Sequence, residues 1–441
     1  MHNRSFHKAI LFVALPMIMG SCDSLNPVAY DNLVTLEIPA DYPVGENQQE
    51  VFRYYLALHP EDQSILAIGE VVPGETLSLD PTEPFTEDHF DLVTVWGTTD
   101  YNEGINSLEV RTHRSFGRGA VLRPGFWSPP TPRANYPMPE IRLLNVSQAD
   151  NEQYQYTLRT TQFYYVTLPG AWVDNQYVFP APDLPASLSG RYILLRTEKA
   201  QPQNMAYQAV ENILDDTTPI EFSNENWITL PTHTLTNNLP GASFSTFFYG
   251  IINEGGYNDL YYLNSYTQNN AGNTFYYPNF GPLFDQTHLS TSMTLDEDNY
   301  RMRVSHEAYF EQNLPSEIPQ YAARLENPNG DFTNFQPTQA QGDNMDYTWI
   351  RAALSTPDVP YVYFSAYGLP DSPIDFVIPV LPDSLHPSLQ VLQQLDQAEQ
   401  RYLRIHLTEL SSLDSYQEYV THIIEHTGVP KGTTQSVQYI W

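Results

Sequence analysis

Several short runs of the sequence combine residue types that could do chemistry, and the first is an acidic cluster. Asp296, Glu297, Asp298 and Asn299 follow one another between two strand-like segments. Calcium prefers carboxylate and amide oxygens and takes about six to eight of them. We therefore predict Asp296, Asp298 and Asn299 as a candidate calcium site. The run lacks the spacing and the fixed glycine of an EF-hand, and an acidic hairpin loop without a ligand is the alternative.

A second run, between residues 244 and 280, interleaves tyrosines with asparagines. Flat aromatic faces and amide donors are the groups that a sugar or protein ligand engages at an exposed site. Tyr257 and Tyr266 lie near glycine-containing turns, so we predict them as exposed ligand-binding residues. Tyrosines that pack across neighbouring strands are the alternative interpretation.

A third run places His422 and His426 on one face of a predicted helix, with Glu425 beside them. The order H-x-x-E-H resembles the motif of the inverzincin metalloproteases. That resemblance implies that the two histidines hold zinc and that Glu425 activates water. The family also has a carboxylate ligand far downstream, whereas no Asp or Glu follows His426 in this chain. We therefore expect a pair of helix-surface histidines.

The sequence contains no other familiar catalytic motif. It has no G-x-S-x-G, no H-E-x-x-H, no phosphate-binding P-loop and no G-x-G-x-x-G. A single cysteine excludes disulfides and a cysteine-only zinc site. We expect a non-enzymatic chain with no catalytic residue and no cofactor, apart from the possible calcium. A hydrolase with an unrecognised site stays open, because the two acids of a glycosidase can lie far apart in sequence.

The single cysteine, Cys22, follows a segment typical of export signals. Arg4 and Lys8 precede about eleven apolar residues, too few to span a bilayer, and small residues come directly before Cys22. This arrangement resembles the lipobox of bacterial lipoproteins, which implies a diacylglycerol on the Cys22 thiol and cleavage before it. An ordinary signal peptide with an incidental thiol is the alternative. The expected location is the cell envelope, lipid-anchored in the outer membrane, with the membrane face left open.

The charge balance restricts the partners. Acidic side chains outnumber basic ones by 52 to 20, and the formal net charge is −32. Such a chain repels nucleic acids and anionic membrane surfaces, so its contact with the membrane is expected through the N-terminal lipid alone. The acidity fits either solubility at high ionic strength or a cation-binding role. A protein or a glycan remains as the expected partner.

The elements that carry these residues are predicted to be mainly β. Short runs such as 34–38, 51–58 and 90–97 alternate apolar and polar residues or are rich in β-branched ones, and turn residues separate them. Trp349, Leu354, Pro357 and Tyr361 resemble the core spacing of fibronectin type III and immunoglobulin-like modules, which implies tandem β-sandwiches. Near the C-terminus we predict helical turns over 384–399, a strand over 401–410, a helix capped by Ser415 and a last strand over 435–441.

The predicted organisation is a signal peptide (1–21), a short tether (22–33), a first sandwich (34–123), a proline-rich linker (124–139), a second sandwich (140–284) and a third with C-terminal helices (285–441). The alternative treats 124–139 as a loop on one larger domain. The layout resembles the fimbrillin-type and glycan-binding surface lipoproteins of Bacteroidota. It implies a binding or assembly module, with glycan binding through exposed tyrosines as the first alternative.

Overall fold

The structure is a computed structural model of the 441-residue chain. It describes residues 32–45, 50–100, 103–125, 140–159, 168–179, 191–201, 204–211, 219–236, 243–254, 257–268, 274–278, 284–297, 299–310, 323–342, 344–357, 359–395, 398–413, 415–425 and 433–441. Within 252–278 the description is limited to the backbone of the strands. The fold is mainly β, as predicted, and its strands form several sheets.

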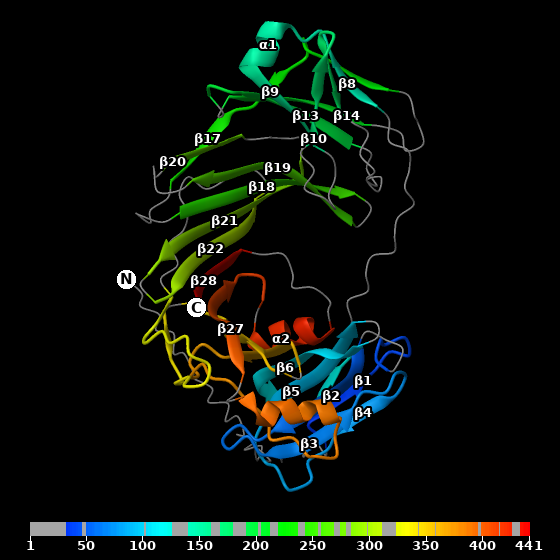
Figure 1. Cartoon of the computed structure of the whole chain (residues 1–441), viewed down its shortest axis with the longest axis vertical. Helices are drawn as coiled ribbons and strands as arrows, with labels where there is room; N and C mark the ends of the chain where they lie inside the picture. Colours follow the sequence, from blue (N-terminus) through cyan, green and yellow to red (C-terminus); the bar gives the residue numbers. More distant parts are fainter. Residues whose placement is uncertain are drawn as a thin grey trace, which may run out of the picture.

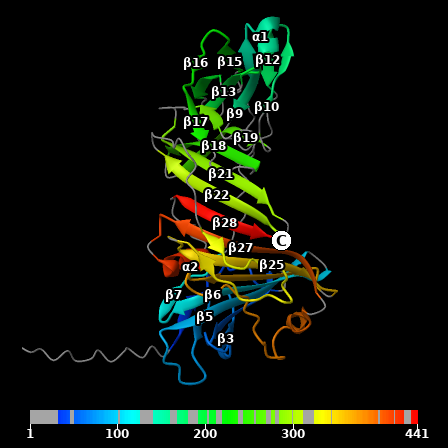
Figure 2. The ribbon, with the colours of Figure 1, turned by 90° about the vertical axis from the view of Figure 1, so that its left-hand side faces the viewer.

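One sheet of 12 strands runs along the long axis of the molecule (Figures 1 and 2). Its strands, in spatial order, are β19 (Tyr257–Gln268), β18 (Ser243–Glu254), β21 (Gln286–Asp296), β22 (Arg301–Phe310), β28 (Thr434–Ile440), β27 (Glu399–Leu410), β25 (Tyr347–Ser355), β26 (Tyr361–Gly368), β6 (Glu103–Gly117), β5 (His89–Asp100), β2 (Glu50–Leu58) and β3 (Ile65–Glu70). Each neighbouring pair is antiparallel except β26 and β6, which run parallel.

The parallel pair joins parts of the chain that are distant in sequence. Tyr361 lies opposite Ser107, and Tyr367 lies opposite His113. At the other end of the sheet, β18 pairs with β21. The large sheet therefore crosses the predicted boundaries near residues 123 and 284 and corrects the division into tandem sandwiches. The alternative of one larger domain agrees with this pairing, while residues 126–139 of the predicted linker lie outside the described residues.

One face of the large sheet is apolar. Leu56, Val95, Val110, Phe364 and Ile405 are each no more than 1% exposed and belong to one continuous core. Two segments, residues 323–342 and 369–395, contribute further apolar side chains to this core from outside the sheet. The first contains the strands β23 (Arg324–Leu325) and β24 (Ala340–Gln341), and the second contains the 3₁₀ helix η2 (Pro387–Gln393).

In the described part of the chain, a small sheet and a helix cover one end of the opposite face. The small sheet contains β4 (Thr76–Leu79), β1 (Val34–Glu37) and β7 (Ala120–Leu122), and the helix is α2 (Tyr416–Glu425). Tyr419 of α2 stacks on Tyr347 with 4.0 Å between ring centroids. The Tyr416 hydroxyl donates to the carbonyl oxygen of Tyr367 at 2.8 Å. Helix α2 therefore packs against this face of the sheet at Tyr347 of β25 and Tyr367 of β26.

A separate group of elements occupies the far end of the molecule (Figure 1). It has its own core of apolar residues, which includes Leu143, Phe179, Leu194 and Phe222. Its elements are β8 (Ile141–Leu144), α1 (Gln148–Gln153), β9 (Tyr154–Arg159), β10 (Leu168–Pro169), β11 (Ala171–Val173), β12 (Gln176–Phe179), β13 (Arg191–Glu198), β14 (Met205–Glu211), β15 (Ile220–Ser223) and β16 (Ile228–Thr229). A further two-stranded sheet pairs β17 (Thr232–Thr236) with β20 (Thr274–Pro278).

The C-terminal elements agree closely with the sequence prediction. The backbone N–H of Glu418 donates to the Ser415 hydroxyl at 3.2 Å, which satisfies one free donor at the start of α2. The predicted strands over 401–410 and 435–441 correspond to β27 and β28. The predicted helical turns over 384–399 are a 3₁₀ helix, in which Leu389 and Leu392 are buried.

Candidate functional site

Three arginines lie in line on the face of the large sheet opposite the apolar core. Arg111 of β6 is opposite Ser365 of β26, which is opposite Arg351 of β25, which is opposite Arg404 of β27. Directly opposed residues on neighbouring strands point to the same side of a sheet. The register therefore gathers arginines from distant parts of the chain on one surface.

A row of rings runs along one side of these arginines. Trp349 lies between Tyr367 and His406 in the strand register. Its ring is nearly parallel to that of Tyr367, with 5.7 Å between centroids, and 4.3 Å from that of His406. The register continues through Gln438 to Arg303 of β22. Arg303 thus extends the cationic surface past the end of the aromatic row.

A second set of rings lies on the other side and supports the arginines. The guanidinium carbon of Arg351 is 5.0 Å from the Tyr363 ring centroid, and that of Arg404 is 4.6 Å from the Tyr402 ring centroid. Stacking on an aromatic face orients a guanidinium without using its N–H donors. We name this surface the arginine–aromatic face. It comprises Arg303, Arg351, Arg404, Trp349, Tyr363, Tyr367, Tyr402, His406 and Gln438.

Acidic partners distinguish these arginines from their neighbours. Arg53 pairs with Glu50 at 2.5 Å and Arg111 with Glu109 at 2.9 Å. Among the described residues, Arg303, Arg351 and Arg404 make no ion pair, although the chain carries 52 carboxylates. Arg351 and Arg404 are half-buried, whereas Arg303 is exposed and its Nε donates to the Ser292 hydroxyl at 2.6 Å. In a protein with so many acids, half-buried arginines without a carboxylate indicate that an external anion can take its place.

Unsatisfied hydrogen-bond donors gather at the same place. The Nε atoms of Arg351 and Arg404 and the Nε1 atom of Trp349 are buried and have no hydrogen-bond partner in the described structure. Buried polar groups in native proteins are nearly always paired, so an unpaired group needs an explanation. Three such groups on adjacent strands mark a surface whose donors the described fold leaves unused.

The pKa of His406 is lowered by its burial and by the arginines around it. Burial, followed by the charges of Arg404, Arg303 and Arg351, lowers the pKa of His406 to about 3. The ring is therefore neutral at physiological pH. The amide Nε2 of Gln438 lies 2.8 Å from the His406 Nε2, which accepts a hydrogen bond when the other ring nitrogen carries the proton. The face owes its positive charge to arginines, whose charge does not change between pH 4 and 9.

His113, at the edge of the aromatic row, gives a testable pH dependence. Burial and the Arg111 charge lower the pKa of His113 to about 3, below about 6.5 for an unfolded chain. Below pH 6.5 the imidazole of His113 takes up a proton in the unfolded state but stays neutral in the folded state. The contribution of His113 to the free energy of unfolding is therefore fully present above pH 6.5. It decreases toward pH 3 by at most about 1.4 kcal/mol per pH unit.

We expect His113→Phe, which keeps a flat ring beside Tyr367, to remove this loss. In chemical denaturation at pH 7 and pH 5, the wild type should lose about 2 kcal/mol more than the variant. An identical loss in both proteins would show that His113 is not buried in its neutral form.

The predicted zinc motif is only partly described. His422 Nε2 lies 3.9 Å from Glu418 Oε1 on the same helix, and His426 is outside the described residues. The Glu425 carboxylate accepts a hydrogen bond from the backbone N–H of Arg123 at 3.0 Å. This contact connects the end of α2 to the segment that follows β7. In the described parts of the chain, no three His, Cys, Asp or Glu side chains gather as possible metal ligands.

The structure separates the predicted calcium ligands. Asp296 pairs with Arg301 at 2.7 Å, and Asp298 lies outside the described residues. Asn299 borders an open hollow of about 520 Å³, which is lined by Asn299, Pro328, Asn329, Gly330, Asp331, Gln400 and Trp441. Gln400 is already used within its wall, because it accepts the Phe332 N–H and donates to the Gly330 carbonyl. The calcium site stays a prediction.

The predicted ligand-binding tyrosines belong to a strand. Tyr257 begins β19 opposite Glu254, and Tyr266 lies within β19 opposite Thr246. Both positions are therefore in the last strand of the large sheet, which corrects their placement in loops. Their side chains lie outside the description, as does Cys22.

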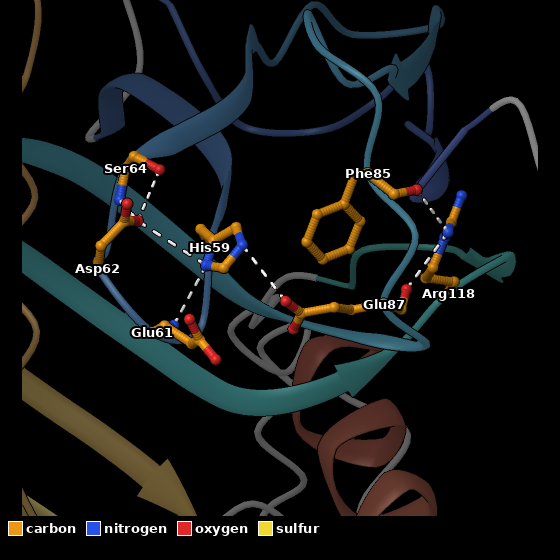
Figure 3. Close-up of polar contacts among 7 residues, drawn as sticks. All are labelled: His59, Glu61, Asp62, Ser64, Phe85, Glu87 and Arg118. Atoms are coloured by element: carbon orange, nitrogen blue, oxygen red, sulfur yellow. Dashed lines mark hydrogen bonds and ion pairs between the residues drawn. The ribbon is translucent and has the colours of Figure 1, made fainter.

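A polar cluster around His59 has a structural role (Figure 3). His59 Nε2 lies 3.3 Å from Glu87 Oε1, and its Nδ1 lies 3.8 Å from Asp62. Arg118 donates to the carbonyl oxygens of Phe85 and Glu87 at 2.9 and 3.2 Å. These contacts connect the turn after β2 to the loop before β5.

Comparison with known proteins gives no family. No family model and no curated protein match the chain. A tetra-tandem repeat from the extending region of a large adhesion protein shares 10% identity, with 85% of this chain and 94% of that chain covered and a TM-score of 0.12. The Bacteroides ovatus mixed-linkage glucan utilization locus protein SGBP-B, in complex with a heptasaccharide, shares 9% identity, with 94% and 96% covered and the same TM-score.

These similarities are too low to support a statement about function, which depends on the geometry of the site. Among the helices in the described part of the chain, none has both the length and the apolar character that crossing a membrane requires.

Proposed function

We propose that this chain is a non-enzymatic binding module of the cell envelope and that its arginine–aromatic face binds an anionic ligand. The observation that carries the proposal is the set of three arginines without carboxylate partners. Arg351 and Arg404 lie side by side and are held by Tyr363 and Tyr402, so their outer N–H groups remain available. Planar guanidinium groups bind carboxylates and related anions in a forked geometry.

The surroundings favour binding over catalysis. Glu109, which lies opposite Tyr363, is engaged by Arg111, and Asp296, at the end of the row through Arg404, is engaged by Arg301. His406 is neutral and bonded to Gln438. A glycosidase would need two available carboxylates and a metalloenzyme a set of ligands. The described part of this face offers donors and rings, which are groups that hold a ligand in place.

The anchor is part of the same proposal. A lipid on Cys22 would hold the body at the envelope, in the outer membrane, where an exported binding module can reach its ligand. Mass spectrometry of the mature protein should show an acylated cysteine as the first residue. A Cys22→Ser protein should leave the membrane fraction after a salt wash, and an unmodified N-terminus in the native protein would remove the anchor from the proposal.

Citrate is a suitable first probe, because it carries three carboxylates and no sugar ring. We expect saturable binding in calorimetry of the full chain at about 0.1 M salt, where the repulsion from the net charge of −32 is screened beyond about 10 Å. Binding should be the same at pH 7.5 and pH 9, because citrate is almost fully ionised in that range and neither the arginines nor His406 change their charge. Absence of citrate binding would overturn the proposed function.

A further inference from the structure

We infer that the natural ligand of the arginine–aromatic face is an acidic glycan chain that lies across the strands, an inference that rests on the proposed function. The juxtaposition that carries it is Arg351 and Arg404 between two sets of aromatic rings, with Arg303 further along the sheet. Neither feature alone selects a glycan. Together they match a ligand that has negative groups at intervals and flat, partly apolar rings between them.

The spacing of the arginines favours an extended ligand. Neighbouring strands are about 4.8 Å apart, so Arg351 on β25 and Arg404 on β27 can hold the same small anion. Arg303 lies on β22, two strands beyond β27 in the sheet order. Its backbone is therefore about 10 Å further along the sheet. Only a ligand with more than one acidic group, separated by a spacer, engages all three arginines.

The aromatic groups supply contacts that a simple anion does not need. Trp349 is partly exposed beside the arginines, and Tyr363 continues to Tyr361 with nearly parallel rings 6.2 Å apart. Tyr361 is 41% exposed and marks the outer edge of this second set. Aromatic rings are suited to the faces of sugars, whereas the arginines are suited to their carboxylates or sulfates.

The overall charge excludes a denser polyanion. Duplex DNA carries about one negative charge per 1.7 Å, and its binding depends on many basic contacts. This face has three described arginines without a carboxylate partner, and the chain has a net charge of −32. A uronic acid chain has one charge per sugar and is repelled far less. An acidic glycan is therefore the anionic polymer that the local and overall charges allow together.

Calorimetry of the full chain with four probes tests the inference. The probes are hexagalacturonate, digalacturonate, a sulfated κ-carrageenan hexasaccharide and the neutral cellohexaose. We expect hexagalacturonate or the sulfated hexasaccharide to bind at least about tenfold tighter than digalacturonate, and cellohexaose not to bind measurably. Carboxylated and sulfated chains are two sources of the same anionic chemistry. The chain that binds with the higher affinity identifies the acid group of the ligand.

Arg303→Gln is the variant that separates an extended ligand from a small one. This substitution should lower the affinity for the acidic hexasaccharide by about tenfold. It should leave the affinity for citrate within about twofold, because citrate needs Arg351 and Arg404 only. Tyr361→Ala should likewise lower only the affinity for the hexasaccharide. The matched control is Arg142→Gln, on β8 in the separate group of sheets at the end of the molecule away from the face. Citrate binding without any gain from chain length would overturn the glycan and leave the proposed function standing. Failure of every anion would overturn both.

Discussion

Glutamine at both Arg351 and Arg404 is expected to weaken citrate binding by about 100-fold, and either single substitution by about tenfold. A hydrogen bond to a charged group contributes about 1.5–3 kcal/mol, and each 1.4 kcal/mol corresponds to a factor of ten. Glutamine keeps much of the side-chain length and one amide donor, so the change removes charge and the forked geometry. The measurement is calorimetry of the full chain at about 0.1 M salt.

Two comparisons make this result specific. Arg142→Gln removes the same charge from a residue that pairs with Glu140 in the distal sheets, and it should leave the affinity unchanged. The double variant should keep the far-UV spectrum of the wild type, because neither arginine belongs to the apolar core. Equal affinities in the double variant and the wild type would place the anion site elsewhere on the chain.

The second large effect concerns the strand that joins the two parts of the sheet. Phe364 of β26 is 1% exposed and packs on Phe332, with 5.3 Å between ring centroids. Phe364→Ala should lower the free energy of unfolding by about 3–5 kcal/mol, because it removes a buried ring and leaves a cavity. Denaturant unfolding followed by fluorescence and by circular dichroism measures this loss.

The same experiment tests the continuity of the sheet. Because β26 pairs with β6 on one side and β25 on the other, residues 50–117 and 347–440 of this sheet should unfold in one transition. Val380→Ala changes a side chain that is 84% exposed and should alter stability by less than about 0.5 kcal/mol. Two separate transitions for these regions in the wild type would contradict the continuous sheet.

The individual elements were largely predictable from local patterns. Alternation over 34–38 and 51–58 corresponds to β1 and β2, and Ser415 caps α2 as expected. Their arrangement was not predictable in the same way. The pairing of β26 with β6 depends on contacts between distant residues, and a strand's own sequence does not say which strand lies beside it.

The candidate site illustrates the same limit. Arg351 and Arg404 each occupy an alternate position in a strand that is otherwise apolar or aromatic on that side, and this pattern was available in the sequence. Its meaning appears only when the register sets the two residues opposite each other. The local clusters at 296–299 and 422–426 were more visible because their members are close in sequence, which does not make them a site.

The most direct test of the arginine–aromatic face is a titration of the full chain, labelled with ¹⁵N-arginine, with citrate while the Nε–Hε resonances are followed. The buried Nε groups of Arg351 and Arg404 lie at the base of the guanidinium groups that we expect to hold the anion. Both resonances should shift in a saturable way, with those of Arg142 and Arg324 unchanged. Resonances of Arg351 and Arg404 that stay fixed at saturating citrate, or that shift no more than every other arginine, would contradict the account.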